Sequence, residues 1–282
     1  MIERRPGLDT VAHLVLMLGV ALVAFPVYVT WVASTQTAEQ VLSAPMSLLP
    51  GSEFVENYRR VMFEGGGAGS RAAVGHMMWV SLVTAVCIAV GKIAISLLSA
   101  FAIVYFRFPG RKLIFWLIFL TLMLPVEVRI APTYAIVASL GLLNTYAGLT
   151  LPLIASATAT FLFRQFFRTV PEELAEAARI DGAGPMRFFV TILLPLSKAN
   201  IAAMFAIQFI YGWNQYLWSR LMTTDESRYP IVIGIRRMIG GGEAANDWNL
   251  VMAAALLAMV PPAIVVLTMQ RWFVKGLVDA EK

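Results

Sequence analysis

The hydrophobic positions along the chain gather in six long runs, and the segments between the runs carry most of the charged residues. Each run provides the ~20 mostly apolar residues that an α-helix needs to cross the hydrocarbon core of a bilayer. The pattern predicts an all-α, polytopic membrane protein with six transmembrane helices. We place the six spans at Val11–Ala33, His76–Tyr105, Leu113–Thr133, Leu143–Phe163, Ala199–Leu221 and Leu250–Phe273.

The third predicted span contains Pro125 and the fourth contains Pro152. Membrane helices tolerate proline where neighbouring helices satisfy the freed backbone groups. The first span follows Glu3-Arg4-Arg5, as the core of a signal peptide would. Its apolar stretch is about twice the usual ~7–15 residues of such a core, so we expect an uncleaved first helix.

The composition supports a membrane protein and excludes two soluble classes. Of the 282 residues, 59% are hydrophobic and 14% are charged, and the mean hydropathy is +0.74. Soluble domains are about half apolar and a quarter charged, so we expect neither a soluble enzyme nor a nucleic-acid-binding protein. The net charge of +5 then fits the basic cytoplasmic loops of a membrane protein. A single cysteine, Cys87, allows no internal disulfide and no paired-cysteine metal site.

The distribution of Lys and Arg between alternate loops predicts the orientation of the chain. One set of segments holds 13 basic and 8 acidic residues; it consists of the N-terminus, residues 107–112, residues 164–198 and the C-terminal tail. The other set holds 8 basic and 9 acidic residues; it consists of residues 34–75, 127–142 and 220–249. The first set is predicted to be cytoplasmic, so both termini face the cytosol. The whole chain, 1–282, is then one transmembrane domain with an exported loop at 34–75.

The cytoplasmic segment 164–198 differs from the other loops in its length and pattern. Thr169–Glu172 has the form of a capping box with a proline in the first turn of a helix. This helix is predicted to stop at Asp181-Gly182. Its apolar side consists of Leu174, Ala177, Ala178 and Ile180. The segment is therefore predicted to begin with a short helix that ends in a glycine bend at the membrane surface.

A second short helix is predicted to begin at Pro185, and Pro195 marks the entry to the next span. The loop has two interpretations. It can be an amphipathic hairpin that covers the bundle at the membrane interface. It can also dock another protein, because small residues that allow a close approach lie beside acidic side chains at fixed points. These residues are Ala177, Ala178, Gly182, Glu176 and Asp181.

The same loop resembles the EAA signature of permease subunits of bacterial ABC importers. That signature reads EAA, three residues, G, nine residues, I, one residue, LP. All its fixed positions are present, namely Glu176, Ala177, Ala178, Gly182, Ile192, Leu194 and Pro195. Other stretches are similar to the maltose-type branch of this family and, within it, to the second permease subunits of glycerol-3-phosphate importers. They include Phe25–Tyr28, Arg107–Gly110, Thr121–Arg129, Phe161–Phe167, Phe209–Trp218 and Gln270–Asp279.

The resemblance implies a type I ABC importer permease in the bacterial inner membrane that works by alternating access. In such permeases the EAA loop seats in a cleft of an ATP-binding subunit, with Glu176 as a charged contact and Gly182 as the bend. The implied partners are a second homologous permease, a dimer of ATP-binding subunits, a periplasmic solute-binding protein and the lipid bilayer. The chain carries no Walker motif, so we expect it to be no enzyme, to bind no cofactor itself, and to depend on ATP and Mg²⁺ held by the partner ATPase.

Ionisable groups inside or near the spans are candidates for contact with the solute. They are Lys92, Glu127 and Arg129. Arg129 could bind a phosphate monoester through two N–H groups, with Lys92 as an alternative point charge. An equally open interpretation is that Glu127 and Arg129 pair with other charges or face water, while Lys92 contacts a partner subunit.

A polar-aromatic stretch in the fifth span offers further candidates, which are Trp213, Asn214, Gln215 and Tyr216. The two aromatic residues can also be packing or interfacial residues. We favour a position along the solute pathway, because the two amides need hydrogen-bond partners in a dry environment.

Two other classes of membrane protein fit the sequence less well. An ion-coupled secondary carrier needs acidic groups deep in its spans, and only Glu127 is close to such a position. A membrane-embedded enzyme needs paired carboxylates or a His–Ser arrangement, and the spans contain neither. Within the importer class, a neutral sugar or a glycerophosphodiester is the alternative to glycerol-3-phosphate.

Overall fold

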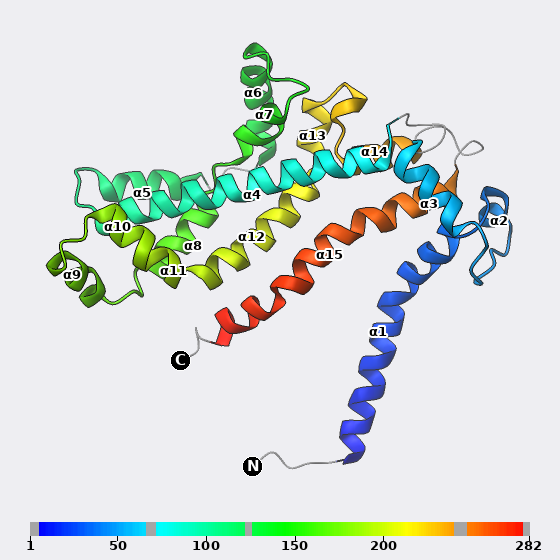
Figure 1. The fold of residues 1–282 in the computed structure, drawn as a ribbon, viewed down its shortest axis with the longest axis horizontal. Helices are drawn as coiled ribbons and strands as arrows, with labels where there is room; N and C mark the ends of the chain where they lie inside the picture. Colours follow the sequence, from blue (N-terminus) through cyan, green and yellow to red (C-terminus); the bar gives the residue numbers. More distant parts are fainter. Residues whose placement is uncertain (1–5, 66–71, 122–125, 240–246, 279–282) are drawn as a thin grey trace. The chain divides into compact units, whose positions relative to one another are not determined.

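The computed structural model describes the backbone of residues 6–65, 72–121, 126–239 and 247–278, and the side chains of 10–65, 72–121, 128–239 and 247–270 (Figure 1). This described part is helical and contains no strand, in agreement with the predicted all-α class. The chain forms two compact units. Unit 1 comprises Met1–His76 and Gly234–Met259, and unit 2 comprises Met77–Ile233 and Val260–Lys282.

Unit 1 is held together by a buried amide network around Asn57. The unit contains α1 (Pro6–Ser34), α2 (Ala38–Leu42), α3 (Phe54–Phe63), the first residues of α4 (Val74–Tyr105), the end of α14 (Ile231–Met238) and the start of α15 (Trp248–Val278). The Asn57 amide donates to the carbonyls of Ser34 and Gln36 at 3.0 and 2.9 Å. Asn249 Nδ2 donates to Asn57 Oδ1 at 3.0 Å. Because buried amides need partners, these bonds fix the turn that follows α1.

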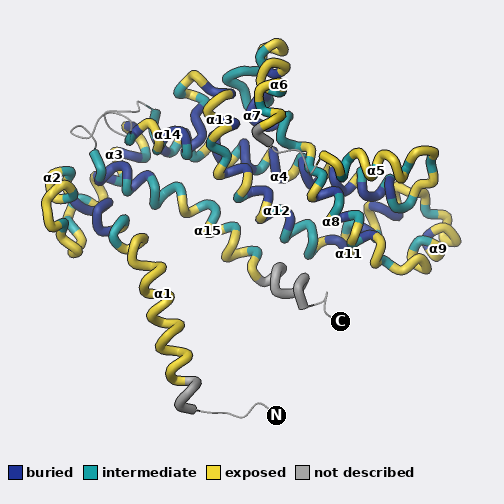
Figure 2. The backbone as a smooth tube through the Cα atoms, turned by 180° about the vertical axis from the view of Figure 1, so that it is seen from behind, coloured by how far each residue is buried: buried dark blue, intermediate teal, exposed yellow. Residues whose placement is uncertain are grey.

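Helix α1 exposes its large apolar side chains along most of its length, as Figure 2 shows. Leu14 is 61% exposed and Leu22 is 72% exposed. A helix that is apolar on all sides is stable only when lipid or another protein surrounds it. The surface of α1 is therefore suited to a bilayer or to a partner chain.

Unit 2 is built around the long helix α4, which α5, α8 and α12 accompany in both views (Figures 1 and 2). Its other elements are α5 (Arg111–Leu120), α6 (Val126–Ser139), α7 (Tyr146–Thr150), η1 (Leu151–Leu153), α8 (Ala157–Phe167), α9 (Glu172–Ile180), α10 (Pro185–Phe188), η2 (Phe189–Leu193), α11 (Leu194–Leu196), α12 (Lys198–Trp213), α13 (Leu217–Met222), η3 (Glu226–Arg228), the first residues of α14 and the part of α15 from Val260. A Cβ on Gly212 would lie 3.0 Å from the Ala85 Cα. The backbones of α12 and α4 therefore approach closely at this point.

Two apolar clusters lie in the described part of unit 2. The first gathers side chains of α4, α8, α9, α10, η2 and α12, among them Phe101, Phe163, Phe189 and Leu193. The second gathers α4, α6, α7 and α13, with Val80, Val137, Leu149, Trp218 and Met222. Each cluster joins residues more than 50 positions apart in the sequence, so each ties several predicted spans to α4.

Three of the predicted spans are single helices that are long and apolar enough to cross a membrane, namely Thr10–Ser34, Val74–Tyr105 and Trp248–Gln270. Two bent helix pairs pass the same test. One joins Tyr146–Leu153 to Ala157–Phe167 with a bend of 48°, and the other joins Pro185–Leu196 to Lys198–Trp213 with a bend of 74°. The described residues thus hold three candidate spans, or five if each bent pair counts as one.

The predictions for the fourth and fifth spans as continuous helices need correction. The third range holds α5, which ends at Leu120, and α6, which begins at Val126; residues 122–125 lie outside the described residues, so the third span stays a prediction. In the fourth range the α-helix gives way to η1 at Leu151, next to Pro152, which has no N–H to donate. In the fifth range α12 ends at Trp213 and α13 is a separate helix, because the polar residues from Asn214 interrupt the apolar run.

Candidate functional site

The segment 164–198, which carries the EAA signature, folds as a helix, a glycine turn and a second helical segment. The N–H of Ala183 donates to the Ala178 carbonyl at 2.8 Å, and the N–H of Gly182 donates to the Arg179 carbonyl at 3.0 Å. With Gly182 at φ +70°, this pair of bonds is a Schellman motif, the usual end of a helix at a left-handed glycine. The predicted stop at Asp181-Gly182 is therefore observed, and Asp181 is the C-cap of α9.

The predicted capping box at the start of this helix is wrong. Helix α9 begins one residue after Pro171, which occupies the N-cap position and provides no side-chain hydrogen bond. The Thr169 hydroxyl instead donates to the Phe166 carbonyl at 2.7 Å, at the end of α8. A serine or threonine three residues before a glutamate also fits the last turn of a preceding helix, and that local bond prevails here.

Helix α9 is exposed on nearly all sides (Figure 2). Of the apolar side predicted for it, only Ala178 is buried; Leu174 and Ala177 are exposed, and Ile180 is 86% exposed. Glu176, Asp181 and Gly182 also lie at the surface. An exposed isoleucine beside exposed small and acidic residues forms a surface that no described residue of this chain covers. Burying an apolar side chain of that size on a partner would stabilise the contact by ~1.5–3 kcal/mol.

The second half of the loop contains a π-helical turn, η2, over Phe189–Leu193. The N–H of Leu194 donates to the carbonyl of Phe189, five residues back. The wider turn accommodates Pro195, whose ring would clash with the carbonyl four residues earlier in a regular helix. Ile192 packs against the first apolar cluster, whereas Pro195 is exposed.

An aromatic cluster fixes this loop to α4 and α8. The ring centroids of Phe101 and Phe189 lie 4.8 Å apart, and those of Tyr105 and Phe188 lie 5.3 Å apart. Tyr105 also packs edge-on against Phe167, at 6.2 Å. Because close-packed aromatic contacts leave little free space, these rings anchor the loop to both helices.

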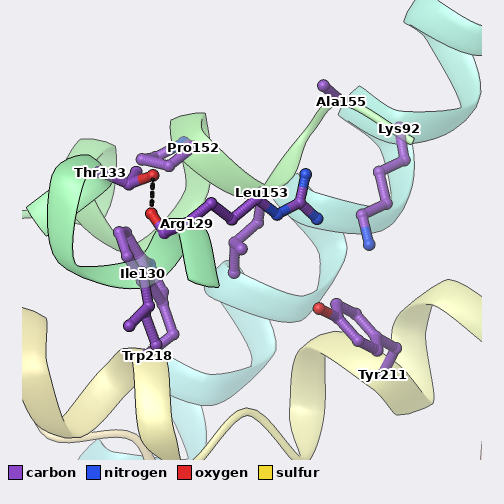
Figure 3. Close-up of a pocket in the computed structure, with 9 residues that line it drawn as sticks. All are labelled: Lys92, Arg129, Ile130, Thr133, Pro152, Leu153, Ala155, Tyr211 and Trp218. Atoms are coloured by element: carbon purple, nitrogen blue, oxygen red, sulfur yellow. Dashed lines mark hydrogen bonds between the residues drawn. The ribbon is translucent and has the colours of Figure 1, made fainter. Parts of the chain in front are cut away.

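A cavity of about 110 Å³ lies elsewhere in unit 2 and holds two of the predicted cationic residues, Lys92 of α4 and Arg129 of α6 (Figure 3). The cationic ends of both side chains point towards one space, and the hydroxyl of Tyr211 from α12 points towards it as well (Figure 3). The remaining lining residues are Ile130, Thr133, Pro152, Leu153, Ala155 and Trp218. None of the nine lining residues is acidic.

Lys92 is only 7% exposed and is held by neutral groups. Its Nζ donates to Gln208 Oε1 at 3.0 Å and lies 3.8 Å from the centroid of the Tyr211 ring. Gln208 and Tyr211 are one helical turn apart on α12, so one face of this helix provides both contacts. Arg129 is exposed at the cavity, and its carbonyl accepts a hydrogen bond from the Thr133 hydroxyl at 2.7 Å (Figure 3).

The cavity wall between α7 and α8 is an interrupted helix that lies close to α4. A Cβ on Gly91 would come within 2.7 Å of the Ile154 side chain, so glycine allows α4 to pass next to the interruption. Ser96 Oγ donates to the Ser156 carbonyl at 3.3 Å. On the other side, Trp218 Nε1 donates to the Gly148 carbonyl at 3.2 Å. Interrupted helices at membrane depth are tolerated where they line a cavity.

The other residues predicted to lie along a pathway are not among those that line this cavity. Trp213 is buried and stacks on Phe209 at 5.8 Å. Asn214 caps α12, its Nδ2 donating to the Ile210 carbonyl at 3.1 Å. Gln215 lies in the break between α12 and α13, and the Tyr216 hydroxyl accepts from Arg220 at 3.2 Å. Glu127 belongs to α6, but its side chain lies outside the described residues.

Sequence reasoning did not identify Gln208, Tyr211 or Thr133 as neighbours of the two cations. Gln208 is 116 residues from Lys92 in the sequence, and no spacing rule connects them. A signal was nevertheless present, since an uncharged polar side chain inside a predicted span needs an internal hydrogen-bond partner. Gln208 is such a side chain in the fifth run, and its partner is Lys92.

The chain matches the family of binding-protein-dependent transport system inner membrane components over residues 92–279. It is similar over 282 residues, and over the full length of both chains, to proteins named sn-glycerol-3-phosphate transport system permease protein UgpE. The identity is 60% for the Brucella melitensis protein, 58% for that of Agrobacterium fabrum and 60% for that of Yersinia pestis.

The fold is also similar to that of a solved structure, a bacterial ABC transporter involved in the import of the acidic polysaccharide alginate. The TM-score is 0.78 at 20% sequence identity, and the match covers 97% of this chain and 100% of that one. At this identity the likeness shows a shared ABC importer permease fold. Together with the family match, it confirms the resemblance read from the EAA loop: the chain belongs to the family of inner membrane components of binding-protein-dependent transport systems.

Proposed function

We propose that this chain is one of two permease subunits of an ATP-driven importer that carries sn-glycerol-3-phosphate across the bacterial inner membrane. The observation that supports this solute is the identity of about 60% over the full length with permeases named for its transport. This sequence identity extends over every helix, including those that line the cavity. It is therefore a stronger reason to infer a shared solute than a similarity of fold alone would be.

The exposed helix α9 is proposed as the surface that docks a partner ATPase. Its exposed isoleucine and acidic side chains lie on a helix whose end is fixed by Gly182, and the aromatic cluster connects this loop to α4 and α8. In this proposal 164–198 is the cytoplasmic coupling loop. A dimer of ATP-binding subunits holds the ATP and Mg²⁺, and closure of that dimer moves the loops and tilts the spans by a rigid-body change.

The proposed topology has six spans with both termini in the cytosol. The charge distribution between the loops supports it. The three long apolar helices and the two bent pairs provide five of the spans, and the apolar run at Leu113–Thr133 is proposed as the sixth. The bend of 74° before Lys198 allows α10 and α11 to lie at the cytoplasmic surface while α12 enters the bilayer. Residues 34–75 then form a periplasmic loop, on the side where a solute-binding protein delivers its ligand.

Transport by a reconstituted importer tests the solute. The complete complex, with the second permease, the ATPase and the binding protein, is placed in vesicles that contain ATP, and uptake of labelled sn-glycerol-3-phosphate is measured. We expect uptake that excess unlabelled sn-glycerol-3-phosphate abolishes and excess maltose leaves unchanged. Uptake of maltose without uptake of sn-glycerol-3-phosphate would show a sugar importer. A strong preference for a glycerophosphodiester would show the diester to be the solute.

A further inference from the structure

The cavity of unit 2 contains more positive charge than its own wall balances. Lys92 and Arg129 both face it, and none of the lining residues that the structure describes is acidic. The contacts of the Lys92 ammonium are a neutral amide and an aromatic ring. Burying a charge without an ion partner costs free energy. Buried ionisable residues in membrane spans therefore often mark the path of a charged ligand. The missing partner is an anion.

The geometry selects a small anion with several oxygen acceptors. The guanidinium of Arg129, the ammonium of Lys92 and the hydroxyl of Tyr211 approach the same space from three different helices (Figure 3). A planar guanidinium presents two parallel N–H groups, which match two oxygens of one phosphate. The volume of about 110 Å³ lies well below the ~300–1,000 Å³ of sites for drug-sized ligands, so the cavity suits a compact solute or the charged end of one.

We propose that this cavity binds the phosphate group of the transported solute, with Arg129 as the bidentate ligand and Lys92 as the second positive charge. Gln208 and Tyr211 are positioning residues, because they hold the Lys92 side chain towards the cavity while the phosphate is absent. The proposal rests on the proposed function and goes further by assigning the recognition of the phosphate to this chain and to these side chains.

The pair of cations also defines the class of phosphate. A phosphate monoester loses its second proton with a pKa of about 6, so it is largely a dianion at neutral pH, whereas a diester keeps one negative charge. Two cations match the monoester, and a diester leaves one of them unbalanced. The site therefore favours a monoester over a glycerophosphodiester, and removal of one cation weakens that preference.

The contacts of Lys92 also explain how the anion can leave. Transport requires binding that is strong enough for entry and weak enough for release. When the phosphate leaves, the Lys92 ammonium still contacts the side-chain amide oxygen of Gln208 and the Tyr211 ring, so it is not left without partners. Gln208 and Tyr211 thus lower the free-energy cost of leaving the Lys92 charge without an anion. The phosphate can therefore dissociate and is not trapped in the cavity.

Substitutions in the reconstituted importer test the site. The variants are Lys92→Met, which keeps the length of the side chain without its charge, Arg129→Gln, and Arg129→Lys, which keeps the charge without the bidentate geometry. The matched control is Lys112→Gln, which removes one positive charge from an exposed position on α5. For each complex we measure uptake of labelled sn-glycerol-3-phosphate, its inhibition by a glycerophosphodiester, and the amount of assembled complex.

We expect Lys92→Met and Arg129→Gln to reduce uptake by about tenfold to a hundredfold. This range corresponds to the loss of one charge-assisted hydrogen bond, which contributes ~1.5–3 kcal/mol. Arg129→Lys retains an intermediate rate, and the control remains near wild type. Both charge-removing variants also bring the apparent affinities of monoester and diester closer together, which a merely structural defect would not do.

The proposal is overturned if Lys92→Met and Arg129→Gln assemble and transport like wild type, or if Arg129→Lys is as impaired as Arg129→Gln. It is also overturned if the variants lose a co-purifying anionic phospholipid while solute uptake is unchanged, because the anion in the cavity is then a lipid headgroup. In each case the wild-type complex still imports sn-glycerol-3-phosphate, so failure of the site is distinguishable from failure of the proposed function, in which wild type imports none.

Discussion

At the scale of single residues, the end of helix α9 depends on one backbone conformation. Gly182 closes α9 at φ +70°, and a Cβ placed there would meet no atom within 4 Å. Space is therefore not the reason for glycine at this position. The reason is the left-handed backbone, which costs an L-residue about 1–2 kcal/mol.

Gly184 offers a matched control for this residue, because it lies two positions away with a φ of −67° and equally open surroundings. We expect Gly182→Ala to lower the number of solute molecules imported per ATP hydrolysed, since the turn that orients α9 is strained. Gly184→Ala is expected to leave that ratio unchanged. The measurement is uptake and ATP hydrolysis in the same vesicles, and equal effects of the two substitutions would contradict the role of the left-handed turn.

The residue scale also shows what the sequence could and could not predict. The signature from Glu176 to Pro195 predicted the bend at Gly182 correctly, because a left-handed helix end depends on local sequence alone. The placement of Lys92 beside Gln208 and Tyr211 could not be predicted, because it arises from the packing of α4 against α12. The capping box was mispredicted, since the Thr169 hydroxyl had a competing acceptor at the end of α8.

At the scale of elements, the aromatic cluster is the connection between the exposed loop and the helices below it. Phe189 is 5% exposed and packs against Phe101 of α4. Its neighbour Val190 is 52% exposed and provides a control on the same helical turn.

We expect Phe189→Ala to destabilise the subunit by about 3–5 kcal/mol, because it removes a large ring and leaves a cavity. Val190→Ala is expected to change the stability by no more than ~0.5 kcal/mol. Thermal unfolding of the purified complex in detergent measures both. A midpoint for Phe189→Ala that equals the midpoint for Val190→Ala would show that the loop is not anchored through this ring.

The elements also show the limit of hydropathy as a predictor. Hydropathy located the apolar runs, but it did not locate the ends of the helices within each run. The runs at α1, α4 and α15 are continuous helices, and hydropathy alone located them. The fourth and fifth runs are interrupted, at Pro152 and at Asn214. Sequence reasoning treated Pro152 as a tolerated proline and Asn214 as part of a span, although breaks of this kind are where a transporter forms its cavities.

At the scale of the whole molecule, the orientation of the chain is the most general expectation. It follows from the excess of basic residues in alternate loops. Thiol labelling of intact cells tests it after Cys87, the native cysteine, has been replaced by serine. Single cysteines are then introduced at Glu39 and at Glu173, which are both exposed.

With a thiol reagent that crosses the outer membrane but not the inner membrane, we expect labelling of Glu39→Cys and protection of Glu173→Cys until the inner membrane is permeabilised. The reverse pattern would place the EAA loop on the exported side, where no ATP is available, and would contradict the docking of an ATPase on α9.

The central claim is that a partner ATPase moves a phosphorylated solute through this chain. The most direct test is uptake of labelled sn-glycerol-3-phosphate by the reconstituted complex in vesicles with three different contents: ATP and Mg²⁺, a non-hydrolysable ATP analogue, or no nucleotide but an imposed proton gradient. The account predicts sustained uptake only with hydrolysable ATP. Uptake that follows the proton gradient and continues without ATP would contradict it.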